Sequence, residues 1–180
     1  MQPTDFNLQQ NYFSLLGQPE NFRLDNAMLD QQYHLLQTQV HPDKFSHLSE
    51  AERRMSMQWA TRANEAYQTL RNPIKRARYL LGLHGVDTQE ETNTVMPMEF
   101  LMEQMEWREA VEEAQRSSDI DQLEKLEARL QHEVSLLQEL LAVKIDDEQS
   151  YSAAAEGVRK LKFLEKLAEE IVSAFDVIDN

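Results

Sequence analysis

The chain has no cysteine among its 180 residues, which excludes disulfide bonds and thiolate metal ligands and is typical of a reducing compartment. Glycine and proline are scarce, with 4 and 5 residues, so the composition predicts an all-α fold. No apolar run approaches the length of a membrane span. Residues 1–5 have neither a basic n-region nor an Arg-rich pattern, so we expect no targeting segment and a cytoplasmic location.

Acidic residues far outnumber basic ones in the second half of the chain. The formal net charge is -14, and almost all of the acidic excess follows His84. Phosphate binding needs clustered Lys and Arg, so we expect no nucleic acid as a partner of the second half. The acidic surface has two interpretations, a solubilising surface and an acidic rim around a partner site, and the sequence leaves both open.

A helical hairpin is predicted near the N-terminus. Apolar residues recur at helical spacing over residues 24–40. Pro42 removes a backbone donor and keeps the preceding residue out of the α region, so this helix must end there. Ser49 and Glu52 have the capping-box pattern, with Ser49 at the N-cap, and predict a second helix over about residues 50–70. The two helices are therefore joined by a tight polar loop.

Two shorter segments complete the predicted first domain. Asn72 is the expected cap of a further helix that Pro73 begins and Gly82 ends. The N-terminal core candidates are Tyr12, Phe13, Leu15 and Leu16. The expected buried stripe of the helix over residues 50–70 comprises Met55, Trp59, Ala63, Ala66, Tyr67 and Leu70.

The loop between the two hairpin helices contains a histidine–proline–aspartate tripeptide. With residues 11–17 and 66–70 around it, this loop resembles the signature of J-domains. J-domains are co-chaperone modules that stimulate ATP hydrolysis by DnaK-type chaperones. The resemblance implies that the chaperone-binding residues are His41, Pro42, Asp43 and Lys44.

The segment of residues 25–40 departs from the J-domain pattern because it contains no Lys or Arg. Typical J-domains carry several basic residues on this helix, which face the acidic ATPase lobe of the chaperone. We therefore expect weaker long-range attraction to the chaperone, which favours a dedicated partner over a general one.

The second half is predicted to be an antiparallel bundle of three helices, because three helices with short joints pack in this way. The first helix begins at Pro97 and runs to about residue 115, and Ser118 with Asp121 is expected to cap the second. The last ends at about residue 177. The predicted organisation is all-α, with a J-domain over residues 1–83, a polar linker over 84–96 and the bundle over 97–180.

The helix that begins at Pro97 has two apolar faces. At about 100° per residue, one face carries Phe100, Trp107, Val111 and Ala114. This aromatic face is the better core candidate, because a helix of such a bundle buries one stripe. The opposite face is then a binding surface, or packs against the first domain or a second copy. It comprises Met98, Leu101, Met102 and Met105, bordered by Glu106, Glu109, Glu112 and Glu113.

The last helix has one continuous apolar arc. Phe163 lies off this arc, between Lys162 and Lys166, where it can extend the binding surface of the helix that begins at Pro97. The expected arc comprises Leu161, Leu164, Leu167, Ala168, Ile171, Val172 and Phe175.

Residues 100–109 and 159–164, taken with the J-domain half, resemble the HscB family, the J-type co-chaperones of iron–sulfur cluster assembly. In that family the second domain binds the scaffold protein IscU, and the J-domain recruits the chaperone HscA. The resemblance implies a co-chaperone that delivers IscU to HscA and stimulates its ATP hydrolysis. The implied scaffold-binding residues are Leu101, Met102, Met105, Glu106, Glu109 and Phe163, with Met105 where the family often has Leu.

Three alternatives to this interpretation fit the sequence less well. A general J-domain co-chaperone that presents unfolded clients usually has a Gly/Phe-rich linker or a cysteine-repeat zinc module, and this chain has neither. An acid–base pair of His41 and Asp43 lacks a nucleophile motif. A metal site of His34, His41 and His47 lacks cysteine and spans a helix end. We therefore expect no enzymatic activity, no metal, no cofactor and no membrane partner.

Overall fold

The computed structural model describes residues 9–40, 49–88 and 96–179, and these are helical without any strand, as the predicted all-α fold requires. None of the described helices is long and apolar enough to cross a bilayer. The helices are α1 (Tyr12–Leu15), α2 (Asn26–Val40), α3 (Glu50–Arg71), α4 (Pro73–Leu83), α5 (Met98–Ser117), α6 (Ile120–Ala142), the π-helical turn η3 (Val143–Asp147) and α7 (Tyr151–Asp179).

The chain divides into two compact units between Leu80 and Leu81, inside α4. The predicted limits of 1–83, 84–96 and 97–180 remain a proposal. The start of the predicted linker packs within the second unit. His84 stacks on Tyr151 of α7 with 3.8 Å between ring centroids, and the Thr88 carbonyl accepts a hydrogen bond from Arg159 at 3.1 Å.

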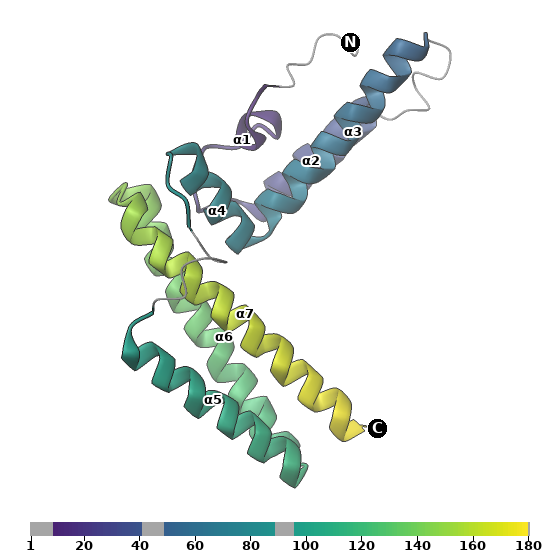
Figure 1. Ribbon diagram of the computed structural model, residues 1–180. Coiled ribbons are helices and arrows are strands. Elements are labelled where there is room, and N and C mark those ends of the chain that lie inside the picture. The colour runs from purple at the N-terminus through teal and green to yellow at the C-terminus, as the bar shows by residue number, and fades with distance from the viewer. Residues whose placement is uncertain (1–8, 41–48, 89–95, 180) are drawn as a thin grey trace. The chain divides into compact units, whose positions relative to one another are not determined.

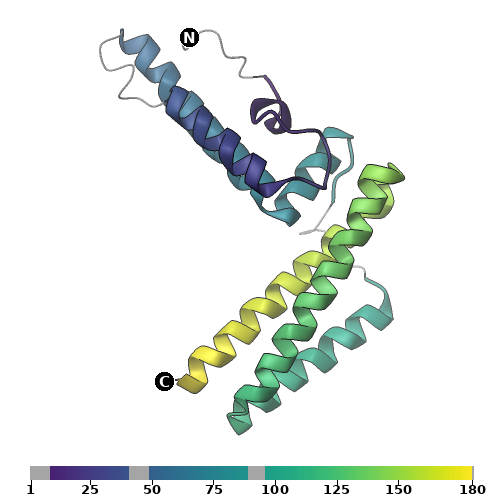
Figure 2. The same cartoon turned by 180° about the vertical axis from the view of Figure 1, so that it is seen from behind.

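In the first unit, α2 and α3 form an antiparallel hairpin (Figure 1; seen from behind in Figure 2). Tyr33 of α2 stacks on Tyr67 of α3, with ring centroids 4.0 Å apart. Phe13 and Leu16 are 0% and 1% exposed, whereas Tyr12 and Leu15 are half-buried. The predicted stripe of α3 is confirmed, with Met55 and Tyr67 half-buried at its edge.

The α4 helix begins as predicted and ends later. Asn72 accepts a hydrogen bond from the Lys75 backbone N–H at 2.9 Å, and Pro73 is the first helical residue. The prediction that Gly82 ends the helix is wrong, because Gly82 lies inside it. Gly85 takes φ +74°, and the next N–H reaches back to the Leu81 carbonyl at 3.0 Å, which is the Schellman arrangement that ends a helix.

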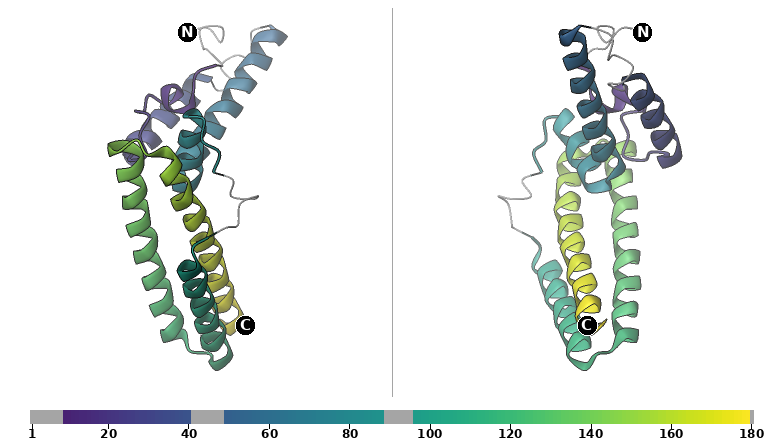
Figure 3. Two further views of the ribbon diagram at one scale, coloured as in Figure 1. Left: turned by 60° about the vertical axis from the view of Figure 1, so that its left-hand side comes forward. Right: turned by 90° about the vertical axis from the view of Figure 1, so that its right-hand side faces the viewer.

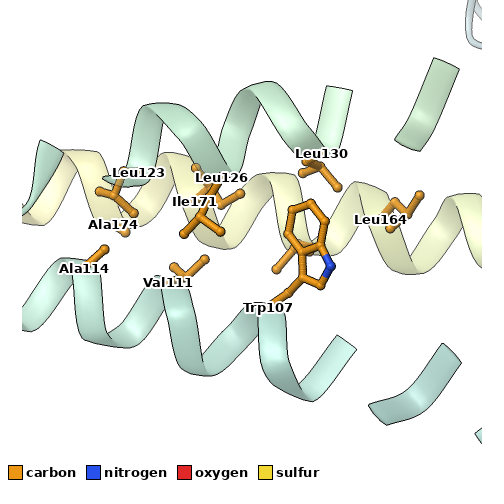
Figure 4. Packing of buried hydrophobic residues seen from close by; sticks show 10 residues of the cluster. Trp107, Val111, Ala114, Leu123, Leu126, Leu130, Leu164, Ile171 and Ala174 are labelled. Atoms are coloured by element: carbon orange, nitrogen blue, oxygen red, sulfur yellow. The ribbon is translucent and has the colours of Figure 1, made fainter. Parts of the chain in front are cut away.

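The second unit is a bundle in which α5, α6 and α7 alternate in direction (Figure 3). Its core is a layered cluster drawn from the three helices (Figure 4). Val172 does not belong to the predicted arc, since its side chain is 54% exposed. The stripe of α7 that the two neighbouring helices bury is narrower than the predicted apolar arc. The buried cluster comprises Trp107, Val111, Ala114, Leu123, Leu126, Leu130, Leu164, Leu167, Ile171 and Ala174.

The turn between α5 and α6 corrects the predicted cap. Ser118 takes φ 54° and is the left-handed C-cap of α5, not the N-cap of α6. Asp119 performs the N-capping role, because its carboxylate accepts from the Gln122 N–H at 2.9 Å.

Candidate functional site

The residues His41, Pro42, Asp43 and Lys44 lie outside the described residues, but both helices that flank them are described. Val40, the last residue of α2, is 2% exposed. Its carbonyl, which has no partner within the helix, accepts a hydrogen bond from the buried Ser56 hydroxyl at 2.7 Å. The end of α2 is therefore attached directly to α3.

The other flank of the loop is held by the predicted capping box. The Ser49 N–H donates to the Glu52 carboxylate at 3.0 Å, and the Ser49 hydroxyl accepts from the Glu52 N–H at 3.4 Å. This reciprocal pair satisfies two backbone donors at the first turn of α3. The loop therefore leaves and re-enters the hairpin at two hydrogen-bonded points.

The hairpin presents its basic residues on α3 rather than on α2. No Lys or Arg occurs in α2. Its acidic residue Asp30 accepts a hydrogen bond from Tyr67 at 3.0 Å and pairs with Arg71 at 3.3 Å. Arg53 and Arg54 are exposed in the first turns of α3, close in sequence to the loop. Arg54 pairs with Glu50 at 3.2 Å, so the first turns of α3 carry both signs of charge.

The α5 helix exposes the predicted Leu/Met face. Met98, Met102 and Met105 are 67%, 57% and 61% exposed, and Leu101 is half-buried. On the opposite face Trp107 is 2% exposed and belongs to the core. We refer to Met98, Leu101, Met102 and Met105 as the methionine strip.

Glutamates border the methionine strip as predicted. Glu106 and Glu109 are exposed, and neither forms an ion pair with any residue that the structure describes. Of the predicted border, Glu113 pairs with Arg116 of the same helix. Arg108 pairs instead with Glu170 of α7 at 3.1 Å. The border of the strip therefore retains negative charge.

Phe163 is half-buried and reaches α5 through Phe100. The two rings meet edge to face, with centroids 5.9 Å apart and an interplanar angle of 77°. The ammonium of Lys160 lies 5.7 Å from the Phe100 ring centroid. Lys160 also pairs with Glu156 at 2.7 Å, and the hydrogen bond from Lys160 lowers the pKa of the Glu156 carboxyl. Phe163 is thus held at the seam of α5 and α7, beside the residue that precedes Leu101.

One polar core residue was missed by sequence reasoning. Gln104 is 3% exposed and lies on the aromatic face of α5, four residues after Phe100 and three before Trp107. The signal was an amide residue at a position where the 3.6-residue period calls for an apolar one. Its oxygen has no hydrogen-bond partner in the described structure.

Comparisons with known proteins identify relatives over nearly the whole chain. The family described as HSCB C-terminal oligomerisation domain matches residues 96–172. The co-chaperone protein HscB homolog of Azoarcus sp. (strain BH72) is 53% identical over 173 residues, which cover 96% of this chain and 98% of that protein. The structure of the chaperone HscB from Vibrio cholerae has a TM-score of 0.83 at 37% identity and covers 93% of this chain and 98% of its own. The human co-chaperone protein HscB has a TM-score of 0.87 at 31% identity, with coverages of 93% and 83%.

Proposed function

The chain belongs to the HscB family of co-chaperones, and from this premise we propose that it delivers the iron–sulfur scaffold protein IscU to the DnaK-type chaperone HscA and stimulates ATP hydrolysis by HscA. The role would assist iron–sulfur cluster maturation and transfer. ATP hydrolysis stays in the chaperone, and this protein supplies binding energy.

The observation that carries the proposal is the exposure of the methionine strip. Three exposed methionines share one helix face with Leu101, and exposed apolar surface gathered in one place is typical of a protein–protein contact. Met side chains are flexible and polarisable, so they adapt to a partner surface, and burying one contributes roughly 1.5–3 kcal/mol. In the proposal Leu101, Met102, Met105 and Phe163 form the apolar contact, and Glu106 and Glu109 select a basic scaffold surface.

The second surface of the proposal is the histidine–proline–aspartate loop. Asp43 would pair with an arginine of HscA, while His41 and Pro42 would hold the loop conformation and Lys44 would add charge. The hydrogen bonds at Val40 and Ser49 support this role, because they anchor the helices on either side. The absence of basic residues in α2 lowers the expected association rate, which suits a dedicated chaperone.

The two surfaces act together through effective concentration. A scaffold bound to the methionine strip is presented to the chaperone on the same molecule that docks by the loop. Linking two binding events in this way raises the local concentration to the millimolar range for a short connection. Loop docking then biases HscA toward its hydrolysing, substrate-clamping state.

Single-turnover ATPase of HscA with IscU tests the proposal. His41→Gln should abolish stimulation with or without IscU. Met105→Glu should weaken IscU binding and reduce only the part of the ATPase stimulation that depends on IscU. Val172→Glu is the matched control, because Val172 is exposed to a similar degree on α7, and it should leave both parts unchanged. Full stimulation by His41→Gln, or equal stimulation when any unfolded protein replaces IscU, would refute the proposed role.

A further inference from the structure

All of the sulfur in this chain is in methionine, because the sequence has 8 methionines and no cysteine. Among the methionines that the structure describes, those more than half exposed are Met57 of α3, at 60%, and Met98, Met102 and Met105 of the methionine strip, at 67%, 57% and 61%. Met96, just before α5, is only 7% exposed. The sulfur that an oxidant in solution reaches most readily is therefore gathered in the strip.

The three thioethers of the strip are neighbours on one side of α5. Met98 and Met102 are four residues apart, and Met102 and Met105 are three apart, so successive Cβ atoms are separated by roughly 5–6 Å. Trp107 and Val111 on the other side of the helix are 2% and 5% exposed and pack in the core (Figure 4). A chemical change in the strip therefore alters the outer surface of the bundle and leaves the core unchanged.

Hydrogen peroxide converts a thioether into a sulfoxide in one two-electron step. The sulfur attacks one peroxide oxygen, the O–O bond breaks and an S–O bond forms. The leaving hydroxide takes the proton from the transferred oxygen and becomes water, so the sulfur is oxidised and the peroxide reduced. Because hydrogen peroxide is neutral, the negative charge of Glu106 and Glu109 beside the strip does not repel it.

We propose that Met98, Met102 and Met105 form a reversible oxidation site that controls the scaffold contact. Sulfoxides are polar, and burying them against an apolar partner surface is unfavourable, so the oxidised strip releases the scaffold. A methionine sulfoxide reductase with a dithiol reductant reverses the change: the sulfoxide oxygen leaves as water and the two thiols become a disulfide. The inference rests on the proposed binding of the scaffold to the strip.

Leucine is the residue that separates oxidation from apolar contact. Exchange of Met for Leu nearly conserves side-chain volume and apolar character, and Leu101 already lies on this face of α5. A leucine strip differs from the methionine strip in flexibility and in having no sulfur, and only the second difference responds to peroxide. The informative quantity is therefore the change of affinity on oxidation, measured for each variant against its own reduced form.

The test measures IscU binding by the full chain before and after treatment with hydrogen peroxide, which catalase removes before IscU is added. Oxidation should weaken binding by the wild type at least ~10-fold, since at least one sulfoxide is then buried without a partner. The triple variant Met98→Leu, Met102→Leu and Met105→Leu should bind equally before and after treatment. Met57→Leu is the matched control, because Met57 is as exposed as Met105 but lies on α3, and it should respond to peroxide as the wild type does.

Three further measurements separate a surface switch from damage. Mass spectrometry should find that bound IscU protects the strip from oxidation but not Met57. Reductases of both stereospecificities should restore IscU binding. Far-UV circular dichroism should stay the same on oxidation, as should HscA stimulation without IscU, because residues 41–44 include no methionine.

Equal IscU binding by the reduced and oxidised wild type would overturn the oxidation site and leave the proposed function standing. Equal peroxide sensitivity of the triple leucine variant, loss of helicity together with binding, or failure of the reductases to restore binding would also overturn it. Absence of IscU binding by the reduced wild type would refute the proposed function, and the oxidation site with it.

Discussion

Gly157 of α7 packs against Leu141 of α6, and replacing it with alanine tests that packing. A Cβ placed on Gly157 would lie 2.8 Å from Cδ2 and 3.2 Å from Cγ of Leu141. Leu141 is 1% exposed, so its side chain has little room to move away. Gly82 is a matched control, because it also lies inside a helix, α4, and a Cβ added to it would meet no atom within 4 Å.

The two substitutions share one favourable effect and differ in one unfavourable effect. Alanine is preferred to glycine in a helix interior by about 1 kcal/mol, and by less near a helix end such as Gly82. Overpacking a filled core costs about 1–3 kcal/mol. Gly82→Ala should therefore raise the free energy of unfolding by roughly 0.5 kcal/mol, whereas Gly157→Ala should lower it by up to about 2 kcal/mol.

Urea unfolding followed by far-UV circular dichroism measures both changes. Amide hydrogen exchange of α7 peptides then localises the effect to the second unit. If Gly157→Ala stabilised the protein as much as Gly82→Ala does, the close contact with Leu141 would not limit the packing of α6 on α7.

Three further predictions concern single groups. Ser49→Ala removes the capping-box acceptor and should lower the free energy of unfolding by about 0.5–2 kcal/mol in urea, whereas Ser49→Asp should restore most of it. Burial raises the pKa of Tyr79 above 10.0 in the folded state. The stabilisation that results from this shift is fully present below pH 10 and is lost as the pH rises through the higher pKa of the folded state. Tyr79→Phe leaves the Tyr12 N–H without its acceptor, should cost about 1 kcal/mol at neutral pH, and should lose less stability than the wild type above pH 10 in thermal melts. The hydrogen bond from Lys160 lowers the pKa of Glu156 below 4.5 in the folded state. The stabilisation that results from this shift is present above pH 4.5 and is lost as the pH falls through the lower pKa of the folded state. Because the pair is partly exposed, Glu156→Gln should change stability by only a few tenths of a kcal/mol, with the difference vanishing in acid and in high salt.

Local signals in the sequence predicted the helix boundaries well where one cap candidate stood alone. Ser49 with Glu52 and Asn72 with Pro73 had no competitor, and both caps form as predicted. The prediction for Ser118 failed because three residues of capping type, Ser117, Ser118 and Asp119, are adjacent there. Which residue caps α6 depends on which residue takes the left-handed conformation at the end of α5. That residue is determined by the preceding helix rather than by the cap pattern.

Helical periodicity predicted the two faces of α5 but not the buried amide side chain on one of them. The angle between Met102 and Trp107 follows from 100° per residue, so exposure of one and burial of the other could be expected. The burial of Gln104 could not be predicted, because it depends on how α6 and α7 pack against α5. That packing is a tertiary property, set by side chains far along the sequence such as Leu136 and Leu164.

Contacts to both neighbouring helices hold α5 in position on the bundle. Two ion pairs cross from it to the other helices, Arg108 to Glu170 of α7 at 3.1 Å and Glu103 to Arg129 of α6 at 3.4 Å. The Arg129 guanidinium also lies 4.3 Å from the Trp107 ring centroid, so one side chain links the helix register to the core. Exposed ion pairs contribute little stability, and their value here is orientation. Because these contacts fix the rotation of α5, the methionine strip is expected to keep its orientation when a partner binds it.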